Sequence, residues 1–147
     1  MKSIQTKSSI TTILTIVAAA IVLFFFSSCA RKIGFQTSSV VPAARGDVKV
    51  KKDNNNNYSI QVTLNNLAEP KRLEPSKSTY VVWMETSDNV TKNIGQINSS
   101  TGFLSNKLKA FFETVSSTKP TKVFLTAEDD AGIQYPGTQV IITTNDF

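Results

Sequence analysis

The chain has 147 residues, with 16 basic and 11 acidic side chains, one cysteine and no histidine. Without histidine, a Ser-His-Asp or Cys-His catalytic arrangement and a histidine-ligated metal are excluded. The basic residues are scattered and the net charge is only +5, so we expect no nucleic-acid partner.

Residues 1–28 predict a cleaved signal peptide. Lys2 and Lys7 precede an uncharged run from residue 10 to residue 26, and small residues follow that run. A positive start, an apolar run and a small-residue exit are typical of a secretory signal. The run is slightly shorter than the roughly 20 residues of a membrane span, so its length leaves a retained anchor open.

The single cysteine, Cys29, lies where the apolar run ends. Phe26-Ser27-Ser28-Cys29 resembles the lipobox of bacterial lipoproteins, whose usual first residue is Leu. The resemblance implies cleavage between Ser28 and Cys29, acylation of Cys29 and attachment to a lipid bilayer. Two other interpretations stay open. The segment could be an uncleaved transmembrane helix, or a plain signal cut near Ser28 or Ala30 that leaves a soluble protein.

Residues 29–45 are predicted to form a flexible, lipid-anchored tether. They sustain no hydrophobic period and contain Gly34, Pro42 and several small polar residues. Four apolar side chains in this stretch are candidates for docking onto the domain: Ile33, Phe35, Val40 and Val41.

One domain is expected over residues 46–147, where hydrophobic residues recur with a period of two. "VKVKK" (48–52) and "YSIQVTL" (58–64) alternate, and the link 53–57 contains only Asp and Asn, which favour tight turns. These segments predict a hairpin. Its lysines, Lys49, Lys51 and Lys52, are expected on a solvated strand face.

Three further segments predict strands rich in β-branched residues. "STYVVWMET" (78–86) is apolar on both faces, which favours a central strand covered on both sides. "KVFLTAE" (122–128) and "TQVIITT" (138–144) complete the set. Residues 103–113 fit either alternation or a helical stripe, and we favour a strand while a short helix stays open.

Several short strands separated by turn residues predict an all-β fold, an immunoglobulin-like antiparallel β-sandwich. Its expected core follows from the alternation within each strand. The core residues would be Tyr58, Ile60, Val62, Leu64, Val82, Trp83, Val123, Leu125, Val140 and Ile142.

A series of motifs runs from Leu67 to Thr144. It comprises a Tyr-x-x-Trp strand, a Gly-anchored strand, a strand ending in Glu, a Gly-containing turn, a Pro and an apolar strand. In this chain they are Tyr80 and Trp83, Gly95, Val123 to Glu128, Gly132, Pro136, and Val140 to Ile142. Together they resemble the extracytoplasmic C-terminal domain of anti-sigma-K factors. The resemblance implies a sensory or interaction module and no reaction. Only nine residues precede the apolar run, so we expect no sigma-binding part.

No enzymatic activity is expected, and no cofactor, catalytic residue or metal ligand is assigned. Ser116-x-x-Lys119 and Ser87-Asp88-Asn89 resemble fragments of penicillin-recognising enzymes, whose Ser-Lys nucleophiles need no histidine. Here their order is reversed and Lys-Thr-Gly is absent. We therefore favour coincidence in a chain rich in serine and lysine.

Two features of the sequence are compatible with ligand binding. Glu128-Asp129-Asp130 could offer oxygens to Ca²⁺, although a polar hairpin turn is favoured because no spaced ligand series follows. Trp83, Tyr80 and Tyr135 are candidate ligand-facing aromatics. For Trp83 we favour the space between the sheets, where large aromatics fill a core.

The sequence thus predicts a non-catalytic lipoprotein of the bacterial cell envelope, bound to the bilayer through Cys29 and contacting an envelope protein. Under the commonest sorting rule of that class, Ala30 after the cysteine is compatible with the outer membrane, facing the periplasm. The alternative function is a carbohydrate-binding or adhesive module. An exposed apolar patch would favour the protein partner, and a groove with exposed aromatics would favour sugar.

Overall fold

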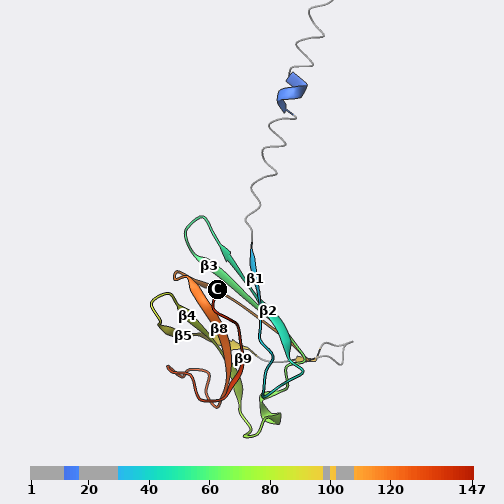
Figure 1. The fold of residues 1–147 in the computed structure, drawn as a ribbon, viewed down its shortest axis with the longest axis vertical. Coiled ribbons are helices and arrows are strands. Elements are labelled where there is room, and N and C mark those ends of the chain that lie inside the picture. Colours follow the sequence, from blue (N-terminus) through green and yellow to red (C-terminus); the bar gives the residue numbers. More distant parts are fainter. Residues whose placement is uncertain (1–11, 17–29, 98–99, 102–107) are drawn as a thin grey trace, which may run out of the picture.

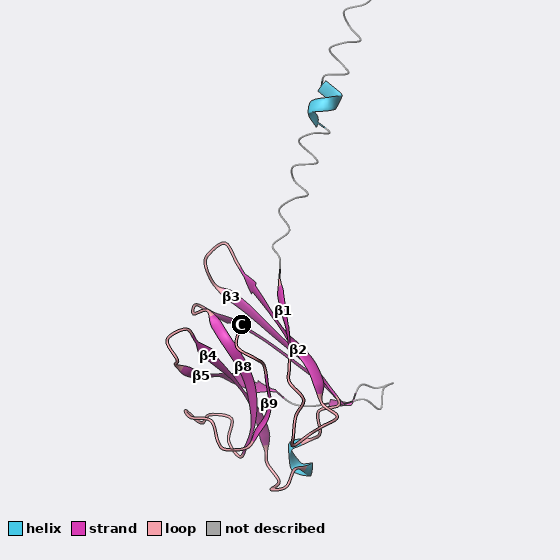
Figure 2. Ribbon diagram, viewed as in Figure 1, coloured by secondary structure: helices cyan, strands magenta, loops and turns pink. Residues whose placement is uncertain are grey.

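The chain folds into an all-β sandwich in a computed structural model that describes residues 12–16, 30–97, 100–101 and 108–147. Two antiparallel sheets face each other, and strands carry nearly all of the regular structure (Figure 1, Figure 2). Residues 12–16 are helical. Within the described ranges, no helix combines the length and apolar character that crossing a bilayer requires.

Within those residues, the first sheet has five strands in the order β1-β2-β3-β7-β6 and the second has four in the order β5-β4-β8-β9. The first sheet contains β1 (Arg31–Gly34), β2 (Arg45–Lys52), β3 (Tyr58–Asn65), β6 (Ser100–Thr101) and β7 (Leu108–Ser116). The second contains β4 (Thr79–Thr86), β5 (Thr91–Ile97), β8 (Pro120–Glu128) and β9 (Val140–Thr143). The chain changes sheet after β3, β5 and β7, and a short 3-10 turn, Pro70–Arg72, lies between β3 and β4.

The core lies between the sheets because alternate residues of each strand point inward. In the first sheet Val62 lies opposite Val48 on one side and Phe112 on the other. Seven of the ten side chains expected in the core are buried in this cluster: Ile60, Val62, Leu64, Val82, Val123, Leu125 and Ile142.

β4 is buried along both of its faces. Tyr80 and Val82 belong to the core between the sheets, whereas Trp83 packs on the opposite face with Phe124 and Ile133. Our expectation that Trp83 fills the space between the sheets is therefore wrong. Trp83 is buried beneath the segment that follows β8.

Val140 is 42% exposed, so its expected place in the core is wrong. The cause is a bulge between β8 and β9. Leu125 pairs with Ile142 but Thr126 pairs with Val140, which leaves Ile141 as an extra residue. A bulge shifts the facing of every residue beyond it, so Val140 lies on the face of the sheet that points away from the other sheet, the same face as the buried Thr126. Tyr58, also expected in the core, is only partly buried.

Residues 31–45 belong to the sandwich, so the expectation of a flexible tether is wrong for the described part of 29–45. β1 pairs with β2 along its length, with Ile33 opposite Val48. Farther along, Val41 and Ala44 are buried. This edge strand was not predicted because its four residues are too few to show a clear alternation of polar and apolar side chains.

The ambiguous stretch 103–113 is a strand where it is described, since β7 begins at Leu108. Ala110 and Phe112 point toward the core, and Phe111 points outward with 63% of its side chain exposed. The rest of that stretch, residues 103–107, lies outside the described residues.

Candidate functional site

The expected signal peptide, its cleavage between Ser28 and Cys29 and the lipid attachment at Cys29 fall outside the described residues, apart from the helical stretch 12–16. The described chain resumes at residue 30, and β1 begins at Arg31. A link of two residues spans at most about 7 Å. Any group attached at Cys29 would therefore lie close to the start of β1.

The sandwich has two ends that differ in their distance from Arg31 (Figure 1). One end, called the Arg31 end below, carries the start of β1 and the turns after β2, β4 and β7. The opposite end, called the far end, carries the connections 35–44, 66–78 and 129–139.

Two of the three expected ligand-facing aromatics are buried. The Tyr80 hydroxyl donates to the Ala68 carbonyl at 2.8 Å, and burial raises the pKa of Tyr80 to about 12. The Trp83 indole N–H donates to Thr126 Oγ1 at 2.7 Å, and its ring stacks on Phe124 with the centroids 6.3 Å apart. Neither ring offers a free face to a ligand.

The third aromatic, Tyr135, is 81% exposed in the connection between β8 and β9. Tyr80 and Trp83 are buried whereas Tyr135 is exposed, so the three aromatic residues do not form one surface site. Of the three candidates, only Tyr135 is accessible to a ligand, and it lies at the far end.

The acidic run at the end of β8 is engaged by its own neighbours. Glu128 accepts the Gly137 N–H at 2.8 Å, and Asp130 accepts the Gly132 N–H at 2.8 Å. Asp129 pairs with the Lys77 ammonium at 2.7 Å. Within the described part of the chain, no group of three or more acidic or cysteine side chains is placed to hold a metal ion. This pattern is that of an ordered turn.

A pocket of about 600 Å³ with polar and apolar lining residues opens at the far end. It is lined by Pro75, Lys77, Ala127, Glu128, Gly137, Thr138 and Gln139. Among the described residues, the buried Gln139 Oε1 has no hydrogen-bond donor. The volume lies in the range of small-molecule sites, roughly 300–1,000 Å³.

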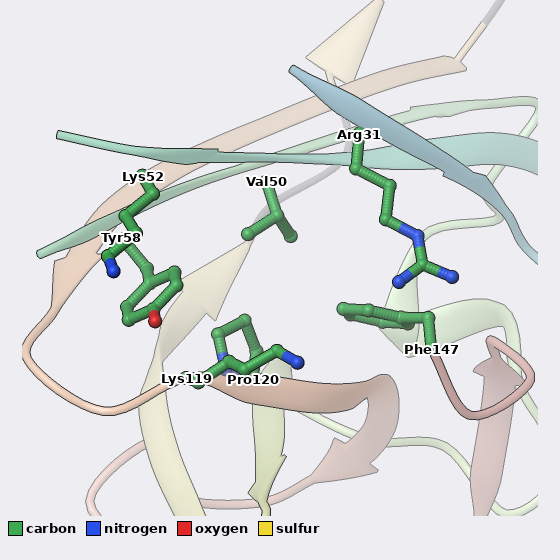
Figure 3. Close-up of a pocket in the computed structure, with 7 residues that line it drawn as sticks. All are labelled: Arg31, Val50, Lys52, Tyr58, Lys119, Pro120 and Phe147. Carbon is green, nitrogen blue, oxygen red and sulfur yellow. The ribbon is translucent and has the colours of Figure 1, made fainter. Parts of the chain in front are cut away.

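A smaller pocket of about 200 Å³ opens at the Arg31 end (Figure 3). It is lined by Arg31, Val50, Lys52, Tyr58, Lys119, Pro120 and Phe147. The Arg31 guanidinium lies over the Phe147 ring at 5.6 Å, and the Lys52 ammonium lies over the Tyr58 ring at 5.9 Å. Cations favour such positions over aromatic faces.

Sequence reasoning missed the pocket at the Arg31 end and the exposed apolar side chains of β7. Lys52 is exposed, as expected for a solvated lysine. Its place at the pocket was missed, although the alternation of Val48, Val50 and Lys52 onto one face of β2 was an available signal. On the outer face of β7, Phe111 and Val115 are 63% and 65% exposed.

Comparisons with known proteins found no counterpart: no family model matches the chain, and no curated protein or solved structure matches it.

Proposed function

We propose that this chain is a lipoprotein of the bacterial cell envelope, anchored through acylated Cys29, that acts by binding a protein partner. One observation carries the proposal: the folded domain begins at Arg31, two residues beyond the lipobox cysteine. An anchor at Cys29 would hold the Arg31 end against the bilayer and turn the far end away from it. More than one acyl chain gives stable attachment where a single chain is marginal.

The strand order supports an immunoglobulin-like sandwich. In that fold one sheet has the order A-B-E-D and the other contains G-F-C, extended by C′ in some members. The orders β2-β3-β7-β6 and β9-β8-β4-β5 correspond to these in sequence and in space, with β1 as an additional edge strand. The proposed likeness to the envelope-side domain of anti-sigma-K factors is compatible with such a sandwich and implies an accessory sensory or interaction module.

A protein partner is favoured over a carbohydrate by the exposed side chains. Trp83 and Tyr80, which would have formed a sugar-stacking surface, are buried. Phe111 and Val115 instead expose apolar surface on one face of β7. Exposed apolar side chains on one strand face, here on either side of Glu113, are candidate contacts for a protein partner. Ala30 after the cysteine supports an outer-membrane location facing the periplasm.

Photocrosslinking in intact cells tests the partner. A photoreactive phenylalanine analogue at Phe111 should give an adduct with one envelope protein, identified by mass spectrometry. The same analogue at Val90, which is 47% exposed at the Arg31 end, is the matched control and should not give that adduct. Glycan adducts, or no protein adduct at Phe111, would contradict the protein-binding role and favour the adhesive alternative.

A further inference from the structure

At the Arg31 end, the last inward-facing pair of residues on β2 and β3 is polar, whereas the pair before it is apolar. In the first sheet Val50 lies opposite Ile60, whereas Lys52 lies opposite Tyr58 and Tyr58 opposite Ser116. Residues two apart on a strand face the same side, so Lys52 continues the inward face of Val50. The space between the sheets therefore opens into the pocket of Figure 3.

Three cations, Arg31, Lys52 and Lys119, surround this opening (Figure 3). Within the part of the chain that the structure describes, none of them forms an ion pair, whereas Lys32 pairs with Asp47 at 3.3 Å. The lining contains no acidic side chain. Like charges gathered around one concave opening, with no acidic side chain among its lining residues, attract an anion.

The rest of the lining is apolar. Val50, Pro120 and the rings of Tyr58 and Phe147 supply it. A cationic rim around an apolar lining fits an amphiphilic anion, with its charge at the rim and its carbon atoms inside. The volume of about 200 Å³ equals about seven water molecules at roughly 30 Å³ each. That is room for a phosphate and a few adjoining carbon atoms.

We propose that this pocket binds the phosphate-bearing headgroup of an anionic lipid in the bilayer that holds Cys29. The inference rests on the proposed function, because the anchor at Cys29 places Arg31 within about 7 Å of the acylated residue. Each Lys or Arg near an anionic bilayer strengthens binding by about fivefold, so three give a preference on the order of 100-fold. Headgroup binding fixes the tilt of the sandwich and keeps the far end directed away from the membrane.

Native mass spectrometry of the full chain in a neutral detergent measures this preference. The probes are phosphatidylglycerol and phosphatidylcholine with identical acyl chains, and glycerol 3-phosphate as the free phosphate. The wild-type chain should retain phosphatidylglycerol on the order of 100-fold more strongly than phosphatidylcholine. A variant with Arg31→Gln, Lys52→Gln and Lys119→Gln should lose nearly all of this preference.

The matched control carries Lys49→Gln, Lys51→Gln and Lys109→Gln, which remove the same charge from exposed positions outside the pocket. It should keep the preference. Three results overturn the proposal: equal retention of both lipids by the wild type, equal loss in the control, or competition by glycerol 3-phosphate as strong as by the lipid. The last result assigns the pocket to a free phosphate.

Two further readouts keep the test decisive. Far-UV circular dichroism checks that the triple variant folds. If it does not, Lys119→Gln alone, in the connection between β7 and β8, must weaken phosphatidylglycerol retention by about fivefold, and no change overturns the proposal. The Cys29→Ala chain must show the wild-type preference, because the pocket is intact. Loss of the lipid anchor, tested by Cys29→Ala, is thereby distinguished from loss of the headgroup site, tested by the pocket variants.

Discussion

Trp83→Ala should lower the free energy of unfolding by about 3–5 kcal/mol, the usual cost of truncating a buried Trp. Trp83 is fully buried, stacks on Phe124 and donates its indole N–H to Thr126. Alanine leaves a cavity beneath the β8–β9 connection and removes the donor to a buried hydroxyl, which itself costs about 1–3 kcal/mol. Urea unfolding followed by far-UV circular dichroism measures the change.

Phe111→Ala is the matched control, because Phe111 is also an aromatic in the middle of a strand but is 63% exposed. Its effect should stay within about 0.5 kcal/mol, as is usual for surface substitutions. A Trp83→Ala variant as stable as the wild type would contradict the burial of Trp83 and return it to the surface as a candidate ligand contact.

Gly46→Ala should cost about 3 kcal/mol, at the upper part of the usual range for overpacking. Gly46 lies opposite Leu64 in the pairing of β2 with β3. A methyl group at Gly46 would come within 2.0 Å of the Thr63 carbonyl oxygen and 2.7 Å of Leu64 Cδ2. The first of these atoms is backbone and cannot rotate away, so the two strands must separate locally. Thermal and urea unfolding both report the loss.

Gly34→Ala makes the same chemical change at the end of β1, where a new Cβ meets no atom within 4 Å. Its effect should lie within about 0.5 kcal/mol. A Gly46→Ala variant that unfolds together with Gly34→Ala would show that β2 and β3 do not approach as closely at Gly46 as the structure places them.

The all-β sandwich was predictable because local alternation determines which residues of a strand share a face. The patterns at 48–52, 58–64 and 122–128 fall within strands of the structure, and β4 covers the pattern at 78–86 except for Ser78. The exposure of Val140 was not predictable, since the bulge that turns it outward depends on pairing with a strand distant in sequence. Single-strand patterns carry no information about such register shifts.

The candidate sites were harder to predict than the fold. Cys29 stands out from the sequence because a resemblance to a lipobox depends on a few neighbouring residues, whereas the pocket at the Arg31 end combines segments from both sheets. Lys52 and Lys119 are separated in the chain by the strands β3 to β7, and the fold brings them to the same pocket. Likewise, Trp83 is covered by Ile133 of the β8–β9 connection, and nothing in the sequence around Ile133 predicts that contact.

The intact mass of the mature protein extracted from membranes tests the central claim most directly. The account predicts a chain that begins at Cys29 and carries a diacylglyceryl group on its sulfur and an acyl group on its amine. Cys29→Ala should remain as an uncleaved precursor or leave the membrane fraction. Ser28→Ala, which keeps a small residue before the cut, should be processed like the wild type. A wild-type protein without acyl groups, or an unchanged mass and membrane fraction for Cys29→Ala, would contradict the anchor.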